Sequence, residues 1–194
     1  MKRFASLLIL CLAILLPAPA INATPITFVT TLLGSNENPA TGSPGTGFAI
    51  VQIDPAAHFL GVHVTFSGLL GLTTAAHIHC CTVPPINAMV ATTVPTFAGF
   101  PLGVTSGTYD IVLDTSAAST WNPAFITAHG GTIPLAEAAF FAGMFAGQTY
   151  LNIHTNLFPG GEIRGVLAIP EPATLALLSA GLLALGFLRR RRSS

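Results

Sequence analysis

The chain has 194 residues, of which 51% are hydrophobic and 7% are charged, and its formal net charge at pH 7 is zero. Six of its seven Lys and Arg residues lie in the first three or the last six positions, which leaves Arg164 as the one strong cation of residues 24–168. Six acidic residues in that segment give it a formal charge of −5 (one minus six). A segment with one cation cannot neutralise a phosphate backbone, so nucleic acid is excluded as a partner.

The first 23 residues have the pattern of a secretion signal peptide. Lys2 and Arg3 precede an apolar run at 4–16, and small residues leading to Ala20 and to Ala23 offer two cleavage sites. We expect signal peptidase to cut after one of these two alanines. The chain is therefore predicted to be exported.

The central segment, residues 24–168, has the length of one domain and is predicted to be mainly β. Short runs rich in β-branched residues lie between Gly, Pro and Asn turns, and Leu60, Val62 and Val64 alternate so that they would share one face. The runs lie at 26–33, 46–53, 58–66, 109–114, 150–155 and 162–168. Their lengths and spacing predict an antiparallel β-sandwich or barrel.

One or two short helical insertions are expected to interrupt this β pattern. Asn122 can cap a helix that has Pro123 in its first position and ends at Gly130. A second helix is predicted over 134–146, a stretch rich in Ala that carries three Phe residues.

Three histidines form a candidate metal site. His77 and His79 occupy alternate positions of a predicted strand, so their side chains would leave one face about 6.6 Å apart, and Cys81 continues the same parity. His154, on a distant predicted strand, can supply a third imidazole. Three imidazoles suit copper or zinc. We expect these histidines to form hydrogen bonds within a packed sheet, each to a carboxylate or a backbone carbonyl, and the metal site is the alternative.

Cys80 and Cys81 are the only cysteines outside the predicted signal peptide. In an oxidising exterior we expect them to close on each other as a vicinal disulfide. Bridges to other chains, or a thiolate that joins His77 and His79 on a metal, are the alternatives.

Arg164 is expected to hold a carboxylate, because it is a single Arg among six acids. We predict a structural ion pair with Glu162, with Glu37 or an Asp as alternative partners. The sequence contains no Gly-x-Ser-x-Gly elbow, no His-Glu-x-x-His motif and no phosphate-binding Gly loop. We therefore predict that the protein is not an enzyme.

The C-terminal tail has three parts in a fixed order: the tripeptide Pro170-Glu171-Pro172, an uncharged run at 173–188, and the cluster Arg189, Arg190, Arg191 and Arg192. A helix over 173–188 would be about 24 Å long, and the arginines would hold its end on the cytoplasmic side. This tail resembles the PEP-CTERM sorting signal of Gram-negative bacteria. The resemblance implies that a membrane-embedded exosortase removes the helix and releases the domain; a permanent membrane anchor is the alternative.

Three blocks of the central segment resemble the chordin-type (CHRD) domain. They are Leu33-Gly34-Ser35-Asn36-Glu37-Asn38-Pro39-Ala40, Ala75-Ala76-His77-Ile78-His79, and residues 150–165 with Asn-Ile-His-Thr and Gly-Gly-Glu-Ile-Arg-Gly. The resemblance runs from about residue 30 to residue 167 and implies an extracellular β-sandwich. In chordin this domain accompanies the binding of a secreted growth factor, whereas for bacterial members the resemblance implies no settled activity or ligand.

We therefore predict a signal peptide at 1–23, a chordin-type domain at 24–168 and a sorting signal with a transmembrane helix at 169–194. The protein is expected to pass through the inner membrane of a Gram-negative bacterium and reach the cell surface or extracellular matrix as a structural or binding module, with a role in biofilm. Its expected partners are signal peptidase, exosortase, and exopolysaccharide or surface proteins. No cofactor is expected unless the alternative holds, in which His77, His79 and His154 bind copper or zinc.

Overall fold

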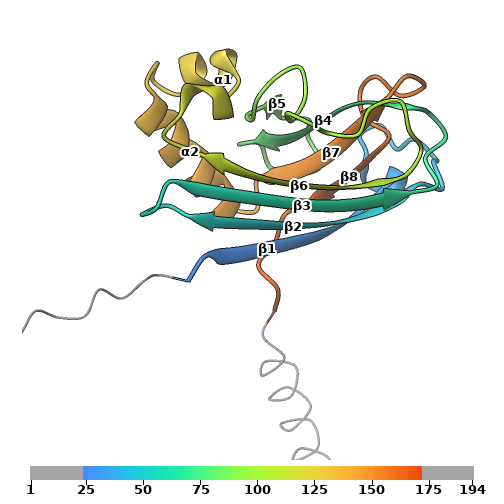
Figure 1. Ribbon diagram of the computed structural model, residues 1–194, viewed down its shortest axis with the longest axis horizontal. Helices are drawn as coiled ribbons and strands as arrows, with labels where there is room; N and C mark the ends of the chain where they lie inside the picture. The colour runs from blue at the N-terminus through green and yellow to red at the C-terminus, as the bar shows by residue number, and fades with distance from the viewer. Residues whose placement is uncertain (1–23, 172–194) are drawn as a thin grey trace, which may run out of the picture.

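The computed structural model describes residues 24–171, which fold around one antiparallel eight-stranded sheet that curls strongly into a half-barrel (Figure 1). The sheet order is β5-β4-β7-β8-β1-β2-β3-β6. The strands are β1 Ile26–Leu33, β2 Thr46–Asp54, β3 Phe59–Ser67, β4 Thr73–Cys80, β5 Met89–Val90, β6 Gly107–Asp114, β7 Thr149–Thr155 and β8 Ile163–Val166. The predicted mainly β fold is confirmed, in the form of one curled sheet.

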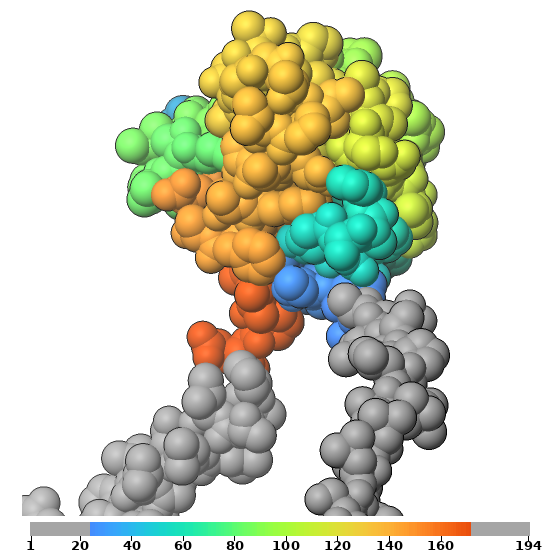
Figure 2. All heavy atoms as spheres, turned by 90° about the vertical axis from the view of Figure 1, so that its left-hand side faces the viewer, coloured from blue at the N-terminus to red at the C-terminus, as the bar shows by residue number. Residues whose placement is uncertain are grey.

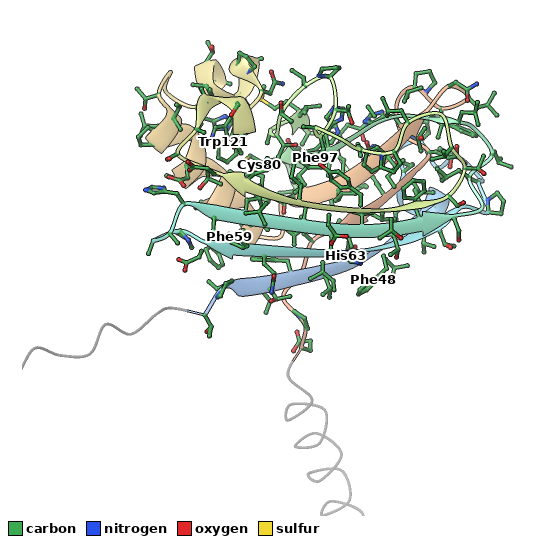
Figure 3. All side chains as sticks on the ribbon, viewed as in Figure 1. Phe48, Phe59, His63, Cys80, Phe97 and Trp121 are labelled. Atoms are coloured by element: carbon green, nitrogen blue, oxygen red, sulfur yellow. A yellow bond between two sulfur atoms is a disulfide. The ribbon has the colours of Figure 1, made fainter. Side chains whose placement is uncertain are left out.

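Successive side chains of a strand point to opposite faces of the sheet, and the face that carries the apolar residues is buried. β2 and β3 pair without interruption from Thr46↔Ser67 to Asp54↔Phe59. Leu60, Val62 and Val64 point into the core, as their spacing predicts. In Figure 3, Phe97 and Trp121 lie inside the curl, whereas Phe48 and Phe59 lie on the outer side of β2 and β3.

Two helices close one end of the half-barrel, α1 Pro123–Ala128 and α2 Ile133–Phe145. Asn122 caps α1, because its side chain accepts the Ala124 N–H at 3.0 Å, and Pro123 occupies the first turn as predicted. Phe140 of α2 meets the buried Trp121 edge-to-face at 5.2 Å between ring centroids, which ties the helix pair to the core. Two 3-10 turns, Gly34–Asn36 and Ala118–Thr120, complete the elements.

Both ends of the described chain lie on the same side of the domain, next to β1 (Figures 1 and 2). The last backbone pairing of the domain joins Val29 to Ala168 through two hydrogen bonds of 2.8 and 3.2 Å. Within residues 24–171, none of the helices has the length and apolar character needed to cross a bilayer. The predicted signal peptide at 1–23, the predicted helix at 173–188, Pro172 and the arginine cluster at 189–192 lie outside the described residues.

Candidate metal centre

The pairing of β4 with β7 brings the three predicted histidines onto one face of two neighbouring strands. In this pairing His77 lies opposite Asn152 and His79 lies opposite Tyr150, while His154 is two positions further along β7. The ring centroids of the three histidines are 5.2 to 5.9 Å apart. Because the neighbouring side chains of opposite parity fill the core, this cluster lies on the outer face of the sheet.

Loops cover this part of the outer face, so His77 and His79 are only 6% and 8% exposed. Each loop gives one histidine ring a backbone carbonyl as its hydrogen-bond acceptor. The pairs are His77 Nε2 with Pro95 O (2.6 Å), His79 Nδ1 with Ala88 O (2.8 Å) and His154 Nδ1 with Pro159 O (2.8 Å). A carbonyl can only accept, so in each pair the ring nitrogen must carry the proton.

These three hydrogen bonds fix the tautomer of every ring. The remaining nitrogens, Nδ1 of His77 and Nε2 of His79 and His154, therefore carry free lone pairs. All three are buried and have no hydrogen-bond partner in the structure. One ring nitrogen from each histidine lies within 4.8 Å of a ring nitrogen of the other two. Each of these close rings also has one buried nitrogen without a partner, so the cluster offers three free acceptors.

Burial also keeps the rings neutral. It lowers the pKa of His77 to about 4, against a smaller opposite effect of the hydrogen bond to Pro95. Burial likewise lowers the pKa of His79 to about 4, and it lowers the pKa of His154. Neutral imidazole is the form that binds metal ions, so the site does not need to lose a proton at neutral pH.

The arrangement fits a transition-metal ion. Nitrogens that share one copper or zinc ion at about 2.0–2.1 Å lie about 3.4–3.6 Å from each other, so each ring has to move inward by less than about 1 Å. Metal-binding histidines usually donate their other N–H to an oxygen acceptor, and the three loop carbonyls provide such acceptors. Among residues 24–171, His77, His79 and His154 are the one group of three or more His, Cys, Asp or Glu residues that meets this geometry.

Cys80 and Cys81 form a vicinal disulfide at the end of β4, directly after His79. Cys81 has a positive φ of 90°, which lets the chain leave the sheet at this point. Its Sγ faces the carbonyl of Ala139 in α2 at 3.6 Å, and Gly143 of the same helix leaves room for both sulfur atoms. The sulfur is therefore engaged with the helix and is not a fourth ligand of the histidine cluster.

Arg164 corrects one prediction, because its carboxylate neighbour is Glu37 and not Glu162. The Arg164 Nε atom lies 3.8 Å from the Glu37 carboxylate, and both side chains are buried. The carboxylate of Glu162 is instead held by Ser43, Thr155 and the backbone N–H groups of residues 70 and 71. These donors satisfy Glu162 completely, so it has no free acceptor for the guanidinium.

The guanidinium of Arg164 ties two loops to the sheet. It donates to the Asn36 carbonyl at 2.5 Å, to Asn87 Oδ1 at 2.6 Å and to the Pro85 carbonyl at 2.8 Å. Its carbon Cζ also lies 4.7 Å from the centre of the Tyr150 ring, which in turn stacks on His79 at 4.7 Å. Arg164 thus positions the loop whose Ala88 carbonyl orients His79.

The sequence analysis did not predict the three backbone carbonyls that accept from the histidines, or a role for the amide of Asn152. Backbone carbonyls carry no sequence signal, although the Pro residues of the 84–95 and 156–161 loops indicate rigid coverage. Strand parity places Asn152 on the same face as His154, but parity alone gives this amide no role in the site. The remaining histidines lie elsewhere: His58 pairs with Glu137 at 2.8 Å, His63 with Asp110 at 2.6 Å, and His129 bonds within α1.

Two family models match the chain. The model of the CHRD domain matches residues 28–167, the larger part of the sequence. The chain belongs to the CHRD-domain family. The model of the PEP-CTERM protein-sorting motif matches residues 168–192, directly after this CHRD domain. Comparison with curated proteins and with solved structures gives no match.

The order of the two matches has a clear consequence for the CHRD protein. A CHRD domain followed by a PEP-CTERM motif implies an exported protein that an exosortase sorts to the cell surface. Pro170 and Glu171 of the motif are exposed, and the last backbone pairing of the domain is at Ala168. A processing enzyme can therefore reach these motif residues without disturbing the sheet.

Proposed function

We propose that this protein is an exosortase-sorted surface or matrix component whose CHRD domain binds one copper or zinc ion through His77, His79 and His154. We assign it a binding role, without catalysis of its own. The observation that supports the metal site is the set of three buried ring nitrogens that face one space with no hydrogen-bond partner.

A purely structural role for the histidines explains only half of their polar atoms. A buried acceptor without a partner costs about 1–3 kcal/mol, and here three such acceptors lie side by side with no donor between them. A shared cation satisfies all three lone pairs at once. The tautomers are already the required ones, so the rings are preorganised for that cation.

Metal analysis of the full-length protein, exported without a polyhistidine tag, tests the metal site. The wild type should contain close to one equivalent of copper or zinc, and His79→Gln should lose it. His63→Gln is the matched control, because His63 is a histidine on the outer face of β3, away from the cluster. A folded wild type that takes up neither metal, or a His79→Gln variant that keeps its metal, would overturn the proposal.

The surface role includes release of the domain from the membrane. Support comes from the PEP-CTERM match and from the exposure of Pro170 and Glu171 just beyond the last paired residue. Mass spectrometry of the protein from a host with an exosortase should give a C-terminus near residue 170, and a host without it should retain the full tail. An intact tail in both hosts would instead indicate a permanent anchor. The mature N-terminus from the same spectrum tests signal-peptide removal.

Binding to matrix polysaccharide is the further part of this role. The domain has a formal charge of −5 and one Arg, so it would contact neutral or cation-bridged polysaccharide in preference to anionic polymers. Co-sedimentation of the released domain with purified exopolysaccharide tests this part. An unbound fraction equal to that of a control protein of similar charge would contradict it.

A further inference from the structure

The histidine cluster leaves a metal ion one ligand short. Within the described part of the chain, the group contains three imidazoles and no carboxylate. Cys81, the alternative sulfur ligand, is bound in the disulfide. Zinc sites with three protein ligands keep a further position for water or substrate, whereas closed structural sites have four protein ligands. The protein group that faces this fourth position therefore influences which ligand binds there.

Asn152 lies in the middle of the cluster. It is directly opposite His77 on β4, two residues before His154 on β7, and next to the pair formed by His79 and Tyr150. Asn152 therefore lies on the same face as the three rings, at the register position between Tyr150 and His154 and opposite His77. Its side chain is 1% exposed, so it must find its partners inside the protein.

The two ends of the Asn152 amide differ in their partners. Nδ2 donates to Oε1 of Glu37 at 3.1 Å, on the side of the sheet where Arg164 lies. Oδ1 is buried and has no partner. Because the two arms of an amide diverge, the hydrogen bond from Nδ2 to Glu37 leaves Oδ1 on the other arm, and on the β4 side of the strand Asn152 lies opposite His77. Among residues 24–171, four of the five buried side-chain N and O atoms without a partner belong to His77, His79, His154 and Asn152.

We propose that the metal held by His77, His79 and His154 keeps an exchangeable fourth position, and that Asn152 Oδ1 selects a ligand there that carries a proton, such as water. This inference rests on the proposed metal site. An oxygen acceptor stabilises a ligand that can donate a hydrogen bond, and it disfavours an anion that presents only lone pairs. Glu37 acts through Asn152, because it accepts from Nδ2 and so fixes which end of the amide faces the metal.

A pocket of about 490 Å³ lies next to residues that contact the site. It is lined by Glu37, Pro84, Pro85, Tyr150 and Arg164, among other residues. Of these, Glu37 accepts a hydrogen bond from Asn152, and Tyr150 stacks on His79. We expect water and small anions to enter from this pocket when the side chains between it and the histidines rotate.

Azide is the probe, added to the full-length protein loaded with Co(II) or Cu(II) and followed by visible absorption. Azide should bind the wild type and change the spectrum, since the position is exchangeable. Asn152→Ala should bind azide about fivefold more tightly, because water loses one hydrogen bond of about 1 kcal/mol. Asn152→Asp should abolish the azide response, because a carboxylate would itself occupy the fourth position. Gln52→Ala, which removes an exposed amide on β2, is the matched control and should behave like the wild type.

The outcomes separate this inference from the metal site itself. Protein that takes up no metal overturns both. Protein that binds metal but gives no azide response in the wild type or Asn152→Ala retains the metal site and overturns the exchangeable position. Equal azide affinity in the wild type and Asn152→Ala overturns the selecting role of Asn152. Asn152→Leu, which keeps the branching of Asn at Cγ and lacks its amide oxygen, gives the same readout if the alanine variant does not fold.

Discussion

Acidification of the metal-free protein should destabilise the domain between about pH 6.5 and pH 4.5. Burial lowers the pKa of His77 and of His79 from 6.5 to about 4, so the unfolded chain binds both protons in this range and the folded chain binds neither. Stability therefore falls as the pH falls through this window. The pKa of His154 is lowered by burial as well, and it acts in the same direction.

Glu37 opposes this effect. Burial raises its pKa from 4.5 to about 7, against the lowering influence of Arg164, so between these values the folded chain binds a proton that the unfolded chain lacks. The stability that Glu37 contributes is thus fully present below pH 4.5 and is lost as the pH rises through 7. When His77, His79 and Glu37 alone are counted, two protons minus one leave a net difference of one proton, and His154 adds to it in the same direction. At about 1.4 kcal/mol per proton and pH unit, the wild type should lose about 3 kcal/mol from pH 6.5 to pH 4.5.

Urea unfolding at a series of pH values, with chelator and 0.15 M salt, measures this dependence. Glu37→Gln removes the opposing proton, so its stability should fall about twice as steeply as that of the wild type. A double variant, His77→Gln and His79→Gln, keeps an N–H donor for each loop carbonyl and should lose no stability over this range. A flat wild-type profile would show that the buried histidines do not titrate in this range, and equal slopes for the wild type and Glu37→Gln would show that Glu37 takes up no proton there.

Metal affinity should persist down to about pH 5 and fall only near pH 4, because protons compete only weakly with the metal ion for rings of such low pKa. Equilibrium dialysis at pH 7, 6 and 5 measures this affinity, and its loss at pH 6 would contradict the low pKa of His79. Arg164→Met should cost about 3 kcal/mol in urea unfolding, because the carbonyls of Asn36 and Pro85 and the side chain of Asn87 lose their donors. Arg164→Lys keeps a charged donor and should cost less, and equal losses would show that these hydrogen bonds are unimportant. Gly143→Ala should lower the free energy of unfolding by about 1–3 kcal/mol, because the added methyl group meets the sulfur of Cys80. In a background with Cys80 and Cys81 replaced by Ala, Gly143→Ala should cost little. An unchanged cost in that background would show that the clash is not with the sulfur atoms.

Local sequence patterns were enough to predict export to the cell surface, the mainly β fold and the histidines of the site. The segments at both ends are local patterns, and composition alone separates them from the acidic centre. The alternation of Leu60, Val62 and Val64 predicted a buried strand face, and Asn122 with Pro123 predicted the start of α1, because caps and strand parity depend on neighbours in the chain. The same parity placed His77 and His79 on one face.

Tertiary structure alone decided how the site is completed. His154 reaches the pair because β7 lies beside β4 in the sheet, and no local pattern specifies that neighbour or its register. The ring tautomers depend on carbonyls of three separate loops, which any residue type could supply. Arg164 binds Glu37 and not the nearby Glu162, because four donors from other segments already surround Glu162. Each of these choices arises from long-range packing that brings distant polar groups into a buried space, where every donor needs an acceptor.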